Sequence, residues 1–228
     1  MQVKDAILGR RSIRAFRSDP VPPPVLREIV EAARWTPSAA NTQPWEFTIV
    51  GGQVLETLRT RLREQFKVDP AGKPEMGWPT NLPERFRERR LWIANAMYTA
   101  LGIAAEDKAG KDEWSHLGVG FFDAPQIIVL TMERGFTELA TMDVGAVAMA
   151  LMLLAHDRGL GTCPQAAPLR YPRIFHEVLR IPETKRVMLV VTIGFPRGES
   201  EVNRFSRIRM SIDECLKWSG IEPGESSV

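Results

Sequence analysis

Hydrophobic residues recur along this chain with spacings that switch between those of helices and those of strands. A spacing of three to four residues is typical of a helix with one buried face, and strict alternation or a short apolar run is typical of a strand. Helical spacing covers residues 3–10, 25–33, 54–66, 84–101, 143–158 and 174–179, and strand patterns cover 45–51, 124–132 and 187–195. The pattern therefore predicts a fold that mixes helices with a sheet.

Two segments carry patterns that a lone chain would not satisfy. The helix expected at 143–158 is apolar almost all round and ends at Gly159, so it should be buried on most sides, which suggests a subunit interface. Residues 197–228 form an arm with sparse apolar content and no core pattern. We expect this arm to lie against another surface.

The segment at 68–83, VDPAGKPEMGWPTNLP, holds four prolines and two glycines and cannot form a regular element. Long loops of this kind serve as lids or binding loops, so we treat 68–92 as a variable lid over a substrate. Residues 160–166 are interpreted as a short connection. No internal repeat or linker divides the chain, and we expect one domain over residues 1–228.

Composition narrows the class of protein. The chain has 228 residues, of which 44% are hydrophobic and 25% charged, as in ordinary globular proteins. Its 30 basic and 28 acidic residues leave a net charge of +2, which gives no case for a nucleic-acid partner. The longest apolar run, 144–155, has 12 residues and is too short for a bilayer. With two cysteines and no signal-peptide pattern, we expect a cytoplasmic protein.

Several kinds of catalytic site are missing from the sequence. The three histidines, at 116, 156 and 176, show no metal-ligand spacing, and neither cysteine lies in a CxxC, so we expect no metal. No GxGxxG, P-loop or GxSxG motif is present. Any demanding chemistry would therefore come from a bound cofactor.

Basic residues gather at both ends of the chain. Residues 1–18 hold five basic side chains against Asp5, a local net charge of +4, and include the segment RRSIRAF from Arg10 to Phe16. Arginine and a hydroxyl just after a helix suit a phosphate, although a solvated basic surface is the alternative. In the arm, Arg204, Arg207 and Arg209 have no acid between them and form either a second half of that site or a soluble tail.

Two loops carry groups that suit a flat heterocycle. The loop TPSAANTQPW, residues 36–45, offers the polar side chains of Ser38, Asn41 and Gln43. These side chains could hydrogen-bond the alternating donors and acceptors of a heterocycle, or they could bond only the backbone of their own turn. The segment GLGTCPQAA, residues 159–167, has glycines that allow close approach of main-chain N–H groups to a ligand. An ordinary helix-to-strand connection is the alternative for the second segment.

Five segments of the chain, taken together and in this order, resemble the FMN-dependent nitroreductase family. They are RRSIRAF, PSAANTQPW, GLGTCPQ, VMLVVTIGFP and RIRMSIDE. The resemblance covers nearly the whole chain. It implies an α+β nitroreductase-like fold with a central mixed sheet flanked by helices. It also implies a homodimer in which extended C-terminal arms are exchanged and two FMN sites lie at the interface.

The resemblance also implies which residues hold FMN. The first basic segment would bind the phosphate, the ribityl chain and the pyrimidine edge of FMN, and the C-terminal arm would close over the phosphate. The segment at 164–167 would lie beside the flavin ring. The 37–41 loop would come from the other subunit. In this sequence these are Arg10, Arg11, Ser12, Arg14, Pro37, Ser38, Ala39, Asn41, Pro164, Gln165, Ala166, Ala167, Arg207 and Arg209.

The activity implied is NAD(P)H-dependent reduction of nitroaromatic compounds or quinones by two-electron, ping-pong hydride transfer. The flavin would carry the chemistry, with Arg14 stabilising its anionic reduced form and the backbone N–H of Ala166 near its N5. Trp78, Phe86 and Trp92 are candidates for the acceptor pocket or for aromatic core packing. Cys163 is interpreted as a small buried filler rather than a redox thiol.

Other activities remain open at this point. Reductive dehalogenation or other flavin chemistry of the same superfamily is one alternative, and a flavin-binding module without turnover is another. Family members that favour one-electron chemistry tend to offer Thr near the flavin N5, whereas this chain has Ala166. We therefore favour two-electron transfer.

Overall fold

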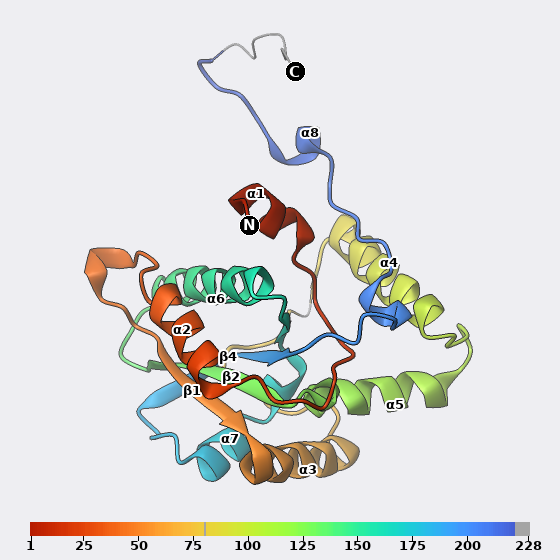
Figure 1. The fold of residues 1–228 in the computed structure, drawn as a ribbon. Coiled ribbons are helices and arrows are strands. Elements are labelled where there is room, and N and C mark those ends of the chain that lie inside the picture. Colours follow the sequence, from red (N-terminus) through yellow and green to blue (C-terminus); the bar gives the residue numbers. More distant parts are fainter. Residues whose placement is uncertain (80, 222–228) are drawn as a thin grey trace.

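A computed structural model describes residues 1–79 and 81–221, which form helices packed around one sheet (Figure 1). The helices are α1 (Val3–Gly9), α2 (Pro23–Ala33), α3 (Gly52–Val68), α4 (Glu84–Ala100), α5 (Lys108–Val119), α6 (Ala140–Asp157), α7 (Pro172–Leu179) and α8 (Ile212–Cys215). The strands are β1 (Glu46–Gly51), β2 (Gln126–Glu133), β3 (Gly161–Gln165) and β4 (Lys185–Gly194). Short 3₁₀ turns occupy Ala39–Asn41, Phe121–Asp123, Ala167–Arg170 and Glu201–Asn203.

Every helix and strand that the sequence predicts is present, and the structure adds elements that the pattern did not reveal. Residues 160–166, interpreted as a connection, contain β3. This strand holds Gly161 and Pro164, which are rare in strands, but it lies at the sheet edge, where proline is tolerated. Helix α5 was missed because only Gly118 and Val119 of its residues are buried.

The sheet has the order β1-β2-β4-β3, and each neighbouring pair of these strands is antiparallel. We expected a mixed sheet of parallel and antiparallel strands. This expectation is wrong for the described residues, whose strands pair only in the antiparallel direction. The parallel contact is a single bridge between Ser12 and Thr162, where the N-terminal segment passes β3 too briefly to form a strand.

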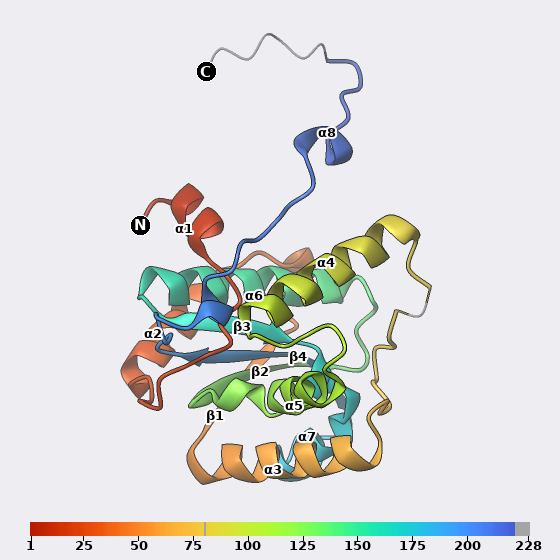
Figure 2. The same cartoon turned by 90° about the vertical axis from the view of Figure 1, so that its right-hand side faces the viewer.

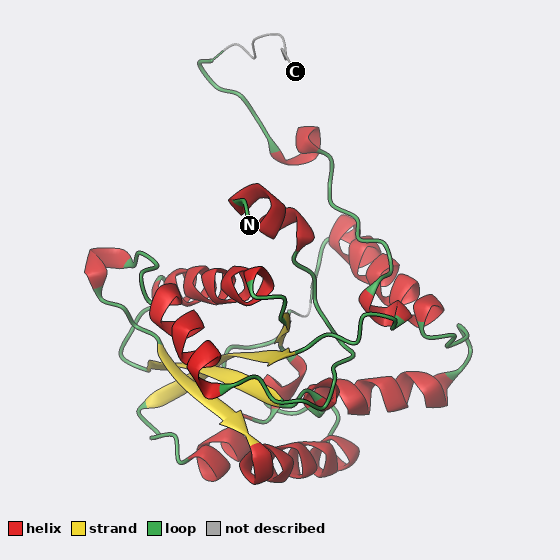
Figure 3. Cartoon of the chain, in the orientation of Figure 1, coloured by secondary structure: helices red, strands yellow, loops and turns green. Residues whose placement is uncertain are grey.

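The two faces of the sheet support separate layers of helices, as Figures 2 and 3 show. Successive side chains of a strand point to opposite faces. Ile128 and Leu130 of β2 accordingly pack with α2 and α6, whereas Ile127 and Val129 pack with α3 and α7. This alternation places the core on both sides of β2 and β4 and leaves β3 at the edge.

Helix α6 is long and apolar enough, by length and composition alone, to cross a membrane, but it is a core helix of this fold. Val147 and Leu151 are fully buried against the sheet. We expected residues 143–158 to be buried on most sides, with a subunit interface completing the burial. Within one chain Gly145 and Ala146 are exposed and Met149 and Leu153 are half-buried, so part of this apolar surface is left uncovered.

The C-terminal arm leaves the body of the protein and extends past α1 and α4 (Figure 2). Large apolar side chains along it, including Ile208, Ile212 and Trp218, are 47%, 64% and 54% exposed. Its main tie to the body near α8 is the ion pair of Glu214 with Arg89, at 2.8 Å. Residues 222–228 of the arm lie outside the described residues.

Candidate cofactor and acceptor site

The N-terminal basic segment lies directly against β3. The backbone N–H of Ile13 donates to the carbonyl of Thr162 at 2.9 Å, next to the bridge of Ser12 with Thr162. Gly161 permits this approach, because a Cβ at that position would lie 2.7 Å from Cγ1 of Ile13. The glycine therefore places residues 10–14 beside the strand that leads to Ala166.

The arm is fastened to the same segment by uncharged and charged side chains. Asn203 is buried, and its Oδ1 accepts from the backbone N–H groups of Arg14 and Ala15 at 2.8 and 3.1 Å. The guanidinium of Arg207 donates to the carbonyl of Leu8 at 2.7 Å and also to the carbonyl of Arg10. Residues about 190 positions apart in sequence thus form one site.

These contacts enclose a hollow of about 140 Å³, which we call the arginine hollow. Its described lining contains five arginines and no acidic residue. The lining residues are Arg10, Arg11, Ser12, Arg14, Ile93, Val202, Phe205, Arg207 and Arg209. The two basic clusters of the sequence therefore meet in space.

Electrostatics make the arginine hollow receptive to an anion. Burial, followed by the charge of Arg209, lowers the pKa of Arg10. Burial also lowers the pKa of Arg207, and Arg11, Arg209 and Arg10 add to this shift. Nε of Arg10 is buried without a hydrogen-bond partner among the described residues. A bound anion would relieve this repulsion and accept from the guanidinium groups.

Buried polar atoms along β3 also lack partners in the described part of the chain. Oγ1 of Thr162 and Nε2 of Gln165 make no hydrogen bond there. Buried polar groups are normally hydrogen-bonded, so unpaired polar atoms beside a cluster of arginines fit a polar ligand such as FMN.

The predicted residues at 164–167 lie at the end of β3. Pro164 and Gln165 belong to the strand, and Ala166 and Ala167 follow it at the start of a 3₁₀ turn.

Cys163 lies in this strand and is 3% exposed. Burial raises the pKa of its thiol, although Arg14, a hydrogen bond with Ser12 and Arg10 act in the opposite direction. A protonated, buried thiol is a poor nucleophile. The geometry therefore favours the interpretation of Cys163 as a filler.

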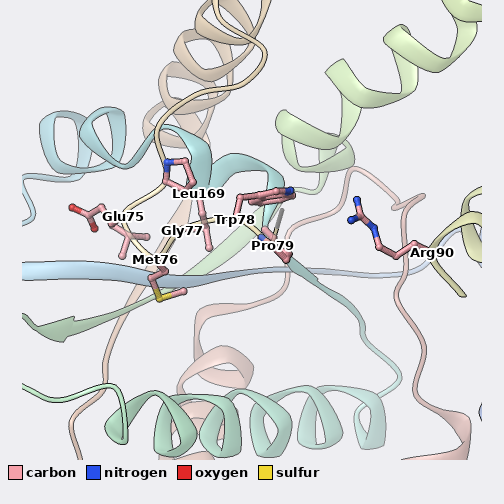
Figure 4. A pocket seen from close by; sticks show the side chains of 10 residues that line it. Glu75, Met76, Gly77, Trp78, Pro79, Arg90 and Leu169 are labelled. Carbon is pink, nitrogen blue, oxygen red and sulfur yellow. The ribbon is translucent and has the colours of Figure 1, made fainter. Parts of the chain in front are cut away.

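A second hollow, of about 320 Å³, lies where the lid loop crosses Ala166 (Figure 4). We call it the apolar hollow, since most of its lining is apolar. The lining residues are Pro74, Glu75, Met76, Gly77, Trp78, Pro79, Arg90, Ala166, Leu169 and Val187.

Of the three aromatic candidates for the acceptor pocket, the structure brings Trp78 to the apolar hollow. Phe86 and Trp92 are not among its lining residues. The ring of Phe86 contacts the guanidinium groups of Arg85 and Arg89 instead, with Cζ atoms 4.8 and 5.5 Å from its centroid. Sequence reasoning missed Arg90, because the run RERR on a polar helix looks like a solvated face.

The loop with Pro37, Ser38, Ala39 and Asn41 does not reach either hollow within one chain. The backbone N–H of Ala39 donates to Asp143 at 3.2 Å, near the start of α6, whereas the terminal amine of Met1 pairs with Asp157 at its end. Helix α6 is roughly 25 Å long at 1.5 Å per residue. The loop and the arginine hollow therefore lie toward opposite ends of α6.

Comparison with known proteins matches this arrangement to one family. The family model "Nitroreductase family" matches residues 7–195. A "NADH dehydrogenase" of Thermus thermophilus is 56% identical over 226 residues, which are 96% of each chain. A "Chloronitrobenzene nitroreductase" of Comamonas testosteroni is 31% identical over 215 residues, 93% of this chain and 94% of that one.

Solved structures agree with the sequence relatives. The FMN and NADPH-dependent nitroreductase NfnB from sphigopyxis sp. strain HMH superposes with a TM-score of 0.93 at 30% identity, covering 97% of this chain and 100% of that one. A fold match of this extent, together with the family model, confirms the nitroreductase-like α+β fold. The chain belongs to the nitroreductase family.

Proposed function

We propose that this protein is an FMN-dependent oxidoreductase that uses NAD(P)H to reduce nitroaromatic compounds. One observation carries the proposal: β3 joins the arginine hollow, beside Thr162, to the apolar hollow, beside Ala166. A molecule with an anionic end and a flat ring suits this pair of hollows. The similarity to NfnB, which is FMN- and NADPH-dependent, and to the chloronitrobenzene nitroreductase supports the same cofactor and reductant.

The residues of the arginine hollow would hold the phosphate end of FMN. Arg10, Arg14 and Arg207 offer guanidinium groups, and Ser12 offers a hydroxyl. Planar guanidinium groups match phosphate geometry with two parallel hydrogen bonds. The unpaired amide of Gln165 and the main chain at Ala166 would meet the more distant part of the cofactor.

FMN held by these residues would supply the redox chemistry, which is two-electron transfer from NAD(P)H to the acceptor. This chain's own part is to bind and orient the acceptor and to exclude water. Met76, Trp78 and Leu169 form the apolar walls that do so. The carboxylate of Glu75 is ion-paired with Arg134, and we expect protons for the reduced nitro group to come from water or from the flavin.

We infer that the working form is a homodimer that exchanges its C-terminal arms. Two observations support this inference: the exposed apolar side chains of the arm, and the loop at 37–41, which lies away from the hollows of its own chain. Deletion of residues 211–228 should lower the dimer fraction measured by light scattering. An unchanged dimer after this deletion would contradict arm exchange.

We place the enzyme in the cytoplasm, where a reducing environment suits its free thiols. Cys163 is buried and Cys215 is exposed, and neither forms a disulfide in the described chain. This proposal is tested by fractionating cells that express the untagged protein.

The decisive experiment is anaerobic mixing of the purified yellow protein with NADH or NADPH, followed by nitrobenzene. The flavin absorbance should bleach with the nicotinamide and return when nitrobenzene is added. A halophenol in place of nitrobenzene tests reductive dehalogenation. A colourless protein that gains no FMN when the cofactor is supplied would exclude flavin chemistry altogether.

A further inference from the structure

Two charged residues line the apolar hollow, and their surroundings differ. The carboxylate of Glu75 is ion-paired with Arg134 and lies 3.8 Å from Nε2 of His176. Arg90 is exposed, and its guanidinium makes no ion pair or hydrogen bond with the described residues. Because the charge of Glu75 is compensated, Arg90 is the one uncompensated charge in the described lining of this hollow.

Arg90 also differs from the other arginines of α4. Arg87 pairs with Glu84, and Arg89 pairs with Glu214. Arg85 lies over the ring of Phe86, with its Cζ 4.8 Å from the centroid. Figure 4 shows the guanidinium of Arg90 directed toward Trp78 and Pro79, at one end of the hollow. Its neighbours are thus engaged elsewhere, while Arg90 faces the space where a ligand would bind.

The rest of the hollow suits a flat aromatic ring. Trp78 contributes an indole over which the guanidinium of Arg170 lies, with its Cζ 4.7 Å from the ring centroid. Cation–π stacking of this kind restrains the indole. Met76 and Leu169 line the same space with flexible apolar side chains. The hollow therefore combines an aromatic wall with a single positive charge at one end.

We propose that Arg90 makes this enzyme prefer nitroaromatic acceptors that carry a carboxylate. This inference rests on the proposed nitroreductase function and specifies its substrate class. The carboxylate pairs with the guanidinium of Arg90, and the ring lies along Trp78. Arg90 binds and orients the acceptor and takes no part in electron transfer, so its loss affects anionic acceptors alone.

Steady-state kinetics on the holoenzyme test the proposal with p-nitrobenzoate and nitrobenzene as paired acceptors. In Arg90→Gln, kcat/KM for p-nitrobenzoate should fall about fivefold, because Arg90 is exposed and solvent weakens a pair of exposed charges. The value for nitrobenzene should stay within about twofold, since it lacks the charge. Arg90→Lys should recover part of the loss, because it keeps the charge without the planar fork.

Arg87→Gln is the matched control, since it removes an arginine of the same helix that does not line the hollow. It should leave both acceptors unchanged. Binding of unreactive analogues provides a readout independent of turnover. By calorimetry on the oxidised holoenzyme, benzoate should bind Arg90→Gln more weakly than wild type, and neutral benzamide should bind both equally.

Three results would overturn the inference. An equal fall for both acceptors would make Arg90 a general support of the hollow. A rise in KM for NADH or NADPH with an unchanged acceptor ratio would assign its charge to a nicotinamide phosphate. Loss of FMN from Arg90→Gln would assign it to the cofactor. If the flavin of the wild-type enzyme bleaches with neither NADH nor NADPH, the proposed nitroreductase function fails as well. If the flavin bleaches normally, a failure concerns the role of Arg90 alone.

Discussion

Asn203 holds Arg14 through a hydrogen bond in which the backbone N–H of Arg14 donates to Asn203 Oδ1 at 2.8 Å. The amide nitrogen of the same side chain donates to the carbonyls of Ala15 and Arg197 at 2.8 and 3.0 Å. An uncharged residue thus ties the arm to the N-terminal segment. The arginine hollow gains a rigid wall without an acidic group that would compete with an anion.

Replacing this amide by an acid tests that role. Asn203→Asp keeps an acceptor for Arg14 but loses both donated hydrogen bonds and adds a buried negative charge. We expect a loss of about 1 to 3 kcal/mol in the free energy of unfolding from the two lost hydrogen bonds, at roughly 0.5 to 1.5 kcal/mol each. The carbonyls of Ala15 and Arg197 keep the backbone N–H groups of Arg197 and Ser200 as donors, at 2.9 and 3.2 Å. Urea titration measures this loss, and FMN retention should fall with it. Asn95→Asp, on the exposed side of α4, is the control and should leave both quantities unchanged.

Arg10→Ala should weaken FMN binding. The guanidinium of Arg10 is partly buried, lines the arginine hollow and has an unpaired Nε. Loss of a hydrogen bond to a charged group costs about 1.5 to 3 kcal/mol, or roughly a ten- to hundredfold rise in Kd. Arg209→Ala should weaken binding less, because its side chain is exposed.

Titration of apoprotein with FMN, followed by flavin fluorescence, measures both values. Arg17→Ala is the matched control, because Arg17 belongs to the same segment but pairs with Asp19 on the surface. Unchanged affinity in Arg10→Ala would mean that the phosphate binds elsewhere.

Gly161→Ala should disturb the contact between the N-terminal segment and β3. The added methyl group would lie 2.7 to 2.9 Å from side-chain atoms of Ile13, so the two strands of chain must separate. Overpacking of this kind costs about 1 to 3 kcal/mol. Thermal unfolding should show a lower Tm, and FMN affinity should fall because Arg10 and Ser12 move. Gly135→Ala, where no atom lies within 4 Å of the new Cβ, should change neither quantity.

The two thiols should differ in reactivity and in pH dependence. Burial raises the pKa of Cys163, so its thiolate fraction stays small until the pH exceeds that raised value. Cys215 is exposed. Iodoacetamide at about pH 8 should therefore label Cys215 and spare Cys163 in the native enzyme, as read by peptide mass spectrometry. Rapid labelling of Cys163 in folded protein would contradict its assignment as a buried filler.

The sequence allowed the fold and the arginine hollow to be predicted because both leave strong local signals. Apolar runs marked β2 and β4, and arginine clusters marked both ends of the chain. Strand β3 gave a weak signal, because its stability comes from pairing with β4 and the N-terminal segment rather than from strand-forming residues.

Arg90 could not be identified as a pocket residue from sequence for a different reason. Its neighbours at 85, 87 and 89 share its chemistry and spacing on a polar helix. Only the path of the lid loop, which brings Met76 and Trp78 across to Ala166, separates Arg90 from them. That path depends on contacts far apart in sequence, such as the hydrogen bond from Lys73 to Arg170.

Helix α6 has a consequence for when the enzyme becomes active. It is one continuous helix of 18 residues, and the loop at 37–41 and the arginine hollow of one chain lie toward its opposite ends. In the proposed homodimer, the 37–41 loop of each flavin site comes from the partner, so a newly made protomer carries an incomplete site. Nicotinamide oxidation would then begin only after two chains meet, and unassembled subunits would leave the cell's reducing equivalents untouched.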